Sequence, residues 1–126
     1  MRVLLDTSTF LWAVLHPENL SKAATAVLLD EATVREISVV SITEIAIKQA
    51  RGKLTFSRED VLQGLEDVQV RVLPYSAEHS FTMFELPLHH ADPFDRQIIA
   101  QALADEIPVV TCDRSFGLYS GLRVIW

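Results

Sequence analysis

Four acidic residues lie where predicted strands end or predicted helices begin, although they are spread over nearly the whole sequence: Asp6, Glu44, Asp95 and Asp113. Only the fold could bring them together. Carboxylates that converge repel one another unless a positive charge lies among them. A hard divalent cation, which prefers oxygen ligands, usually supplies this positive charge. The four acids therefore predict a metal-dependent enzyme that acts on phosphates.

The elements that must position these acids alternate between strand and helix along the chain. The apolar runs lack polar alternation, as expected for strands buried on both faces of a parallel sheet. We expect an α/β fold with three α/β/α layers and a mostly parallel sheet of about five strands, forming a single domain over residues 1–126. The predicted strands are 2–5, 36–40, 70–73, 108–112 and 123–126, and the predicted helices are 7–15, 22–31, 42–51, 57–68, 76–86 and 92–105.

Asp6 and Asp113 share one feature, because each follows an apolar run at the C-terminal end of a predicted strand. Ligands of open α/β sheets bind at those ends, near the point where the strand order reverses. An acid in this place is also a common helix cap. The pattern alone leaves both interpretations open.

Glu44 has a strong structural alternative. Ser41 and Glu44 have the spacing of a capping box that would start a helix over 42–51, ended by Gly52. Lys48 lies one helical turn further on and is an ordinary i,i+4 partner for the glutamate. For a role in chemistry, the start of this helix must face the ends of the strands.

Asp92 and Asp95 repeat the ambiguity at the start of the last predicted helix. Asp92 precedes Pro93, as a cap precedes a proline in the first helical position, and Asp95 falls three residues later. Asp95 is the better ligand candidate because it lies inside the first turn. Arg96 could meet phosphate oxygens or be a solvated surface charge. The nearby histidines, His89 and His90, are expected in a polar loop beside the acidic site.

Composition narrows the class of protein. The chain has 126 residues, 49% of them hydrophobic, and a formal net charge of −6. This charge disfavours a plain nucleic-acid-binding module, but less so a nuclease whose metal ions supply positive charge locally. Its one cysteine rules out an internal disulfide and fits a reducing cytoplasm. No apolar run approaches the roughly 20 residues of a membrane span. We therefore expect a cytoplasmic protein with no membrane contact.

Four sequence motifs resemble those of one known family. The opening "LLDTSTFLWA" resembles the first strand and acid of PIN-domain ribonucleases, and "SITEIAIKQARGKL" is similar to their second motif. The segment "HHADPFDRQIIAQALADEIPVVTCDRSF" resembles the third and fourth motifs. Each motif alone is weak, but together they cover the chain in order. Within the family, the resemblance is to the VapC toxins of bacterial toxin–antitoxin pairs.

The resemblance implies a Mg²⁺- or Mn²⁺-dependent endoribonuclease that hydrolyses RNA phosphodiesters. It further implies a cognate VapB-like antitoxin and a homodimer. In this family pattern the four acids are the catalytic residues and the ligands of one or two metal ions. Glu44 would complete the metal site or orient the attacking water. Residues of a second rank are Asp92 and two hydroxyls near the site, Ser8 and Thr111.

Two other classes of protein remain open. A metal-dependent phosphatase or phosphotransfer domain of the haloacid dehalogenase type also has an acid after its first strand. Such enzymes have a second aspartate two residues after the first, where this chain has Ser8. A non-catalytic PIN-like interaction domain would keep the fold and not the chemistry.

Overall fold

The computed structural model describes residues 1–126 and contains one five-stranded sheet, in the order β3-β2-β1-β4-β5. All four strand pairings are parallel, which confirms the predicted α/β fold and its number of strands. The strands are β1 (Arg2–Leu5), β2 (Val34–Ser38), β3 (Val70–Leu73), β4 (Val109–Val110) and β5 (Val124–Ile125).

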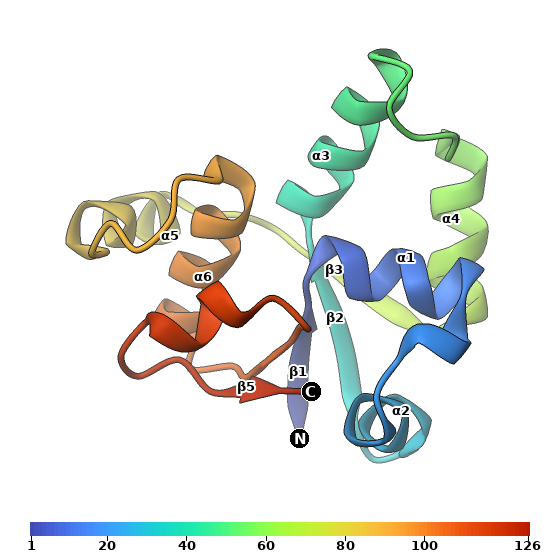
Figure 1. Ribbon diagram of the computed structural model, residues 1–126, viewed down its shortest axis with the longest axis horizontal. Coiled ribbons are helices and arrows are strands. Elements are labelled where there is room, and N and C mark those ends of the chain that lie inside the picture. Colours follow the sequence, from blue (N-terminus) through green and yellow to red (C-terminus); the bar gives the residue numbers. More distant parts are fainter.

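Helices cover both faces of the sheet and give the three predicted layers (Figure 1). One face carries α1 (Thr7–Leu15), α2 (Lys22–Leu29) and α4 (Arg58–Asp67), and the other carries α5 (Ala77–Thr82) and α6 (Pro93–Asp105). Helix α3 (Val39–Ala50) continues from β2 and extends beyond the C-terminal edge of the sheet. Three short 3₁₀ helices are η1 (Pro17–Asn19), η2 (Met83–Glu85) and η3 (Arg114–Leu118). None of the helices has the length and apolar character that a membrane span requires.

The hydrophobic core consists of two clusters, one on each face of the sheet. On the α1 side Val3 and Leu5 of β1 pack with Phe10, and on the α6 side Leu4 packs with Ile98 and other apolar residues. Successive residues of β1 therefore point into opposite clusters. Burial on both faces explains why this strand reads as a continuous apolar run.

The predicted boundary between the second strand and its helix is wrong. The strand was expected over 36–40, and a helix capped by Ser41 over 42–51, but β2 ends at Ser38 and α3 begins at Val39. The hydroxyl of Ser38 accepts from the backbone N–H of Val40 at 3.1 Å and is the true cap. The β-branched valines favour a strand locally, yet Val40 buries its side chain in the α6-side cluster from within the helix. Tertiary packing overrides the local preference.

Other boundaries shift less. The helix expected over 22–31 ends at Leu29, and that expected over 76–86 divides into α5 and η2. The strand expected over 108–112 is only two residues long. Two further helices begin where they were expected: Ser57 and Asp60 form a capping box at the start of α4, and Asp92 caps α6 before a proline in the first turn.

The topology places the predicted site at one edge of the sheet. From β1 the chain moves outward to β2 and β3, then returns to the other side of β1 for β4 and β5. The strand order therefore reverses between β1 and β4, where open α/β sheets bind their ligands. Asp6 follows β1 directly, and Asp113 follows β4.

Candidate active site

Asp6 is a buried carboxylate at the point where β1 becomes α1, with only 4% of its surface exposed. One oxygen, Oδ1, accepts from the backbone N–H of Thr9 at 2.9 Å, so Asp6 is the cap of α1. The other, Oδ2, accepts from the hydroxyl of Thr111 at 2.6 Å. Burial raises the pKa of Asp6, and the nearby charge of Asp113 raises it further. Capping and a place in the acidic site therefore coexist in one side chain.

Thr111 joins the ends of the two strands at the switch point. Besides donating to Asp6, its hydroxyl accepts from the backbone N–H of Asp113 at 3.0 Å. The carboxylate of Asp113 accepts in turn from the backbone and the hydroxyl of Ser115, at 2.9 and 2.7 Å, and caps η3. Asp113 is itself exposed, so its carboxylate lies at the mouth of the site.

Glu44 is buried within α3 and does not form the predicted capping box. Its Oε1 accepts from the hydroxyl of Thr7 at 2.6 Å, and its Oε2 lies 2.7 Å from Nζ of Lys48. The hydroxyl of Ser41, expected to be the cap, lies instead 2.8 Å from that of Thr7. The start of α3 therefore faces the start of α1 across the C-terminal edge of the sheet.

Asp95 lies in the first turn of α6, and Asp92 caps that helix through bonds to the backbone N–H groups of Phe94 and Asp95 at 2.9 and 3.0 Å. Burial raises the pKa of Asp95 to about 7, and the charges of Asp92 and the other three predicted site acids add to the rise. Five carboxylates from four segments therefore act on one another electrostatically. Such a perturbed carboxyl at the end of a parallel sheet marks a candidate functional site.

The loop before α6 lies beside these acids, as predicted. His90 places Nε2 at 3.6 Å from Oδ2 of Asp95, and its Nδ1 lies 2.7 Å from the hydroxyl of Tyr119. Arg96 donates to that same hydroxyl at 3.0 Å and to the carbonyl oxygen of Pro87 at 2.9 Å. Its guanidinium therefore holds the loop in place and is not directed at the carboxylates, which favours neither of its two predicted roles.

Three residues at the site were missed or misread in the sequence. Thr7 supplies the hydroxyl on Glu44, whereas the expected hydroxyl, Ser8, is exposed and makes no bond to the acids. Ser41 was predicted to cap α3, but its hydroxyl contacts that of Thr7. Lys48 was read only as a helix partner of Glu44, and that ion pair is confirmed, but the charges of Asp92 and Asp95 also raise the pKa of Lys48. The one local signal that could have identified Thr7 is its position directly after Asp6.

The donor set of the acidic site suits a hard divalent cation. All of the ligand candidates are carboxylate oxygens, and their mutual repulsion is what a bound Mg²⁺ or Mn²⁺ would relieve. In the present arrangement no group of three His, Cys, Asp or Glu side chains lies close enough together to hold a metal ion. The chemistry of the residues fits the ion, and hydrogen bonds to protein groups orient the carboxylates of Asp6, Glu44 and Asp113 in this arrangement.

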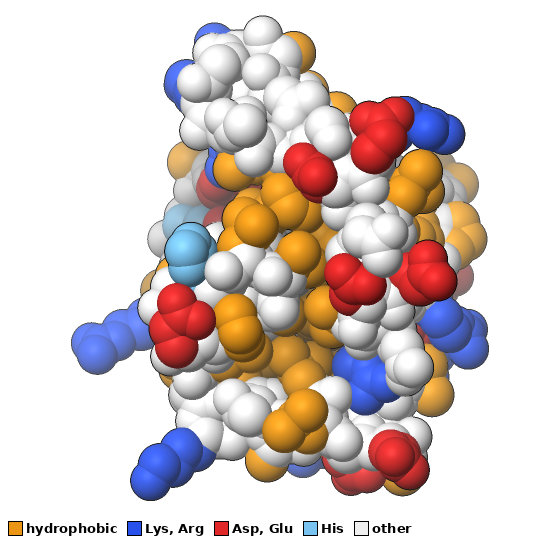
Figure 2. Space-filling view, turned by 90° about the vertical axis from the view of Figure 1, so that its right-hand side faces the viewer, with side chains coloured by type: hydrophobic (Ala, Val, Ile, Leu, Met, Phe, Trp, Pro, Cys, Tyr) orange, Lys and Arg blue, Asp and Glu red, His pale blue; other side chains and the backbone are white.

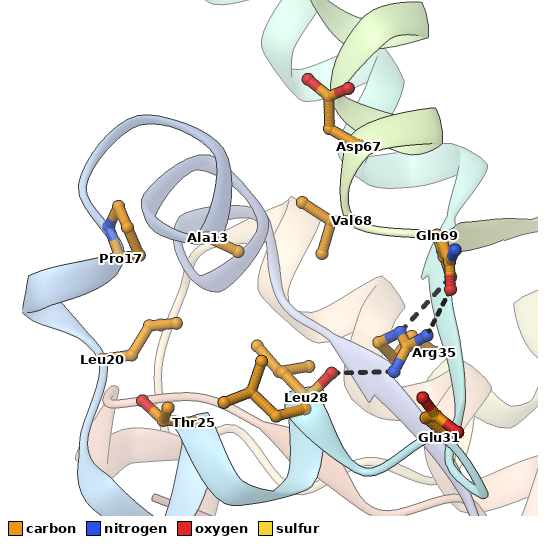
Figure 3. A pocket seen from close by; sticks show the side chains of 11 residues that line it. Ala13, Pro17, Leu20, Thr25, Leu28, Glu31, Arg35, Asp67, Val68 and Gln69 are labelled. Carbon is orange, nitrogen blue, oxygen red and sulfur yellow. Dashed lines mark hydrogen bonds between the residues drawn. The ribbon is translucent and has the colours of Figure 1, made fainter.

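The larger hollows of the surface lie away from the acids. A cavity of about 360 Å³ lies between α1, α2 and the start of β2. Figure 3 shows that the guanidinium of Arg35, at the edge of this cavity, already has hydrogen-bond partners within the protein. It donates to the carbonyl oxygen of Leu28 at 2.8 Å and to Gln69. Figure 2 shows hydrophobic side chains along the middle of the face that carries α1, α2 and α4, with acidic side chains on both sides.

A second hollow, the α3–α4 groove, shares a helix with the site. It has a volume of about 550 Å³ and is mostly apolar. Its walls come from α3, α4 and β3, and they include Ile42, Ile45, Phe56, Val61, Leu65 and Val72. Because α3 also carries Glu44, this groove and the acidic site lie on two sides of one helix.

Comparison with known proteins decides the family. The sequence pattern of the PIN domain matches residues 3–122, nearly the whole chain. The chain belongs to the PIN-domain family. This PIN domain has no match among the curated proteins with which its sequence was compared.

Solved structures share the fold of this PIN domain at low sequence identity. VapBC2 from Rickettsia felis, bound to a DNA fragment from its promoter, has a TM-score of 0.71 and 18% identity over 98% of this chain and 97% of that chain. VapBC-5 from Mycobacterium tuberculosis, a toxin–antitoxin system, has a TM-score of 0.63 and 21% identity over 98% and 96%. FitAcB from Neisseria gonorrhoeae has a TM-score of 0.62 and 18% identity over 97% and 95%.

Proposed function

We propose that this PIN domain is a Mg²⁺- or Mn²⁺-dependent endoribonuclease that acts as the toxin of a toxin–antitoxin pair in the cytoplasm. The observation that carries the proposal is the acidic site itself. Carboxylates from four segments lie at the switch point of a parallel sheet, and their charges together with burial raise the pKa of Asp95 to about 7. The family match supports the choice of nucleic acid as the substrate.

The chain's own residues would divide the work as follows. Asp6, Asp95 and Asp113 would hold the metal, and Glu44 would complete the site or orient the attacking water. When bound, the metal would lower the pKa of that water and neutralise the charge that develops on the phosphate. Thr111 fixes one oxygen of Asp6, and Thr7 fixes one oxygen of Glu44, so both carboxylates are oriented before substrate arrives.

The toxin role is supported by the solved structures that share this fold, which include toxin–antitoxin systems and complexes. We propose a VapB-like antitoxin as the partner of this chain, and a homodimer as its assembly. The α3–α4 groove is a suitable surface for an apolar segment of the antitoxin, because it is large and shares α3 with the active site.

One cleavage assay tests the enzymatic part. The purified chain is mixed with a long single-stranded RNA, and with DNA of the same sequence, in Mg²⁺, in Mn²⁺ and in excess chelator. We expect RNA to be cut only when metal is present, and the Asp6→Asn variant, purified identically, to be inactive. Glu66→Gln is the matched control, since it removes one exposed acid of α4 away from the site. Undiminished cleavage in chelator, or by Asp6→Asn, would refute the proposal.

A non-catalytic interaction domain is the second candidate, and one observation favours it. No three acids lie close enough together to hold a metal ion in the present arrangement. Titration calorimetry with Mn²⁺ separates the two candidates. Binding at micromolar to low millimolar concentration that is lost in Asp6→Asn supports the nuclease, whereas no binding in this range supports the interaction domain.

A further inference from the structure

Lys48 is the only lysine or arginine that forms an ion pair with any of the four acids Asp6, Glu44, Asp95 and Asp113. Its Nζ lies 2.7 Å from Oε2 of Glu44. Its hydrogen bond to Glu44 raises the pKa of Lys48 most, and the charges of Asp92 and Asp95 raise it further, so acids of two segments of the site act on its ammonium. Lys48 therefore supplies positive charge at the place where a metal ion is expected.

The two oxygens of Glu44 are held by donors of different mobility. The hydroxyl of Thr7, which holds Oε1, belongs to a buried residue and is fixed further by Ser41 at 2.8 Å. The ammonium of Lys48, which holds Oε2, belongs to a side chain that is 47% exposed. Thr7 cannot leave without disturbing the core, but Lys48 can move into solvent by rotation of its own side chain.

We propose that Lys48 is a positioning residue that holds Glu44 in the metal-free protein and is displaced from Oε2 when a divalent cation binds. The inference rests on the proposed function, because it needs a metal at the acidic site. An ammonium and a divalent cation repel each other at short range, so each disfavours the other beside the same carboxylates. Lys48 thus stabilises the empty site and competes with the metal for Glu44.

Removal of the ammonium should have two opposite effects. In Lys48→Met the metal-free protein loses the partner of a buried carboxylate, so its melting temperature in chelator falls. The same variant no longer competes with the cation, so its affinity for Mn²⁺ rises about two- to fivefold at low ionic strength, a range typical of one partly exposed charge pair. The gain should shrink in high salt, because salt screens the competing charge.

The experiment is a calorimetric titration of Mn²⁺ into five proteins: wild type, Lys48→Met, Lys48→Arg, Lys53→Met and Asp6→Asn. Lys53 follows α3, is exposed and forms no ion pair, so its variant controls for the change in net charge. Lys48→Arg keeps the charge and should bind Mn²⁺ like wild type even if Lys48→Met folds poorly. We expect tighter binding in Lys48→Met alone. Thermal unfolding in chelator and in Mn²⁺ gives the second readout.

Two failures are distinguishable. If wild type binds Mn²⁺ and Asp6→Asn does not, but Lys48→Met binds with equal or weaker affinity than wild type, the proposed role of Lys48 is wrong and the proposed nuclease stands. A purely structural lysine would give that result together with a lower melting temperature. If wild type binds no Mn²⁺, or if Asp6→Asn binds it equally well, both the role of Lys48 and the metal-dependent function are overturned.

Discussion

Two regions of this PIN domain bury acidic side chains, but only one of them pairs its acid with arginines. Glu36 lies in the middle of the sheet, on β2, with no exposed surface. Arg2 donates to both of its oxygens, at 2.7 and 3.3 Å, and Arg71 lies 3.5 Å from it. At the C-terminal edge of the same sheet, the acidic site gathers carboxylates whose one lysine or arginine partner is Lys48.

We interpret this difference as separating a structural buried acid from the acids that we propose to be functional. A buried carboxylate costs several kcal/mol unless cations and hydrogen bonds compensate it. Glu36 has such compensation from two arginines and needs nothing else. Asp6 and Asp95 have hydroxyl, amide and imidazole neighbours but no arginine or lysine in contact, and the pKa of each is raised. A deficit of positive charge in one place is what an ion-binding site requires before its ion arrives.

The largest expected effect follows substitution at the acidic site. Asp6→Asn should reduce cleavage of RNA by about 10³-fold or more, as expected when a group needed for charge stabilisation in the transition state is lost. The fold should survive, because asparagine is also a good cap for α1. Circular dichroism and thermal unfolding check the fold, and a single-turnover cleavage assay checks the activity. Activity within tenfold of wild type would place the chemistry elsewhere.

At Glu36, whose charge is compensated by arginines, we expect the reverse: a loss of stability without a loss of activity. Arg2→Met leaves Glu36 with only the more distant Arg71, so the free energy of unfolding should fall by about 2 kcal/mol. Cleavage per folded molecule should stay unchanged, because the pair lies in the middle of the sheet and not at its C-terminal edge. Urea denaturation measures the stability, with Arg123→Met as a control that removes an exposed arginine without an ion pair. Equal stability of the two variants would contradict the contrast between the regions.

The pH dependence of stability should report on Asp95. Its pKa is about 7 in the folded protein and about 4 in the unfolded chain. Because the folded pKa is the higher one, this group contributes stability that is fully present below about pH 4 and is lost as the pH rises through about 7. Asp95→Asn abolishes that loss. In chelator, the variant should match wild type at low pH and exceed it by about 1 kcal/mol at pH 8, after allowance for solvent screening.

Urea denaturation of wild type and Asp95→Asn at several pH values gives this difference directly. Glu66→Gln serves as the matched control, and its curve should run parallel to that of wild type. A constant difference between wild type and Asp95→Asn across the range would show that Asp95 does not titrate abnormally.

The smallest effect is expected from the hydroxyl that orients Glu44. Thr7→Val keeps the shape of the side chain and removes the donor to Oε1. We expect stability to change by about 1 kcal/mol, and cleavage to fall about three- to tenfold, because Glu44 keeps Lys48 but loses its fixed orientation. Ser8→Ala is the neighbouring control and should behave like wild type. A larger loss in Ser8→Ala than in Thr7→Val would reverse the assignment of the hydroxyl.

The fold was largely predictable because buried parallel strands are continuous apolar runs and most helices carry local start signals. Ser57 and Asp60 form the capping box that their spacing predicts. Ser41 and Glu44 have the same kind of spacing and do not. Their partner, Thr7, is more than thirty residues away in sequence and becomes a neighbour only after folding. Contacts that depend on tertiary structure leave no mark in local spacing.

The places of three of the acids in the fold were predictable for a related reason. Asp6, Asp92 and Asp113 each cap a helix, so local pattern placed them correctly in the fold without giving the distances between them. The parallel topology brings the strand ends that precede Asp6 and Asp113 to one edge of the sheet. The distances between the acid side chains, and the ion pair of Lys48 with Glu44, depend on rotamers that sequence does not specify.

The most direct test of the account is an X-ray measurement of anomalous scattering from Mn²⁺ in crystals of the wild-type chain. We predict a manganese peak at the C-terminal edge of the sheet, within ligand distance of Asp6 and at least one of the other three acids, with Lys48 withdrawn from Glu44. Crystals of Asp6→Asn should lack the peak. A map with no manganese among these carboxylates at millimolar concentration would contradict the account.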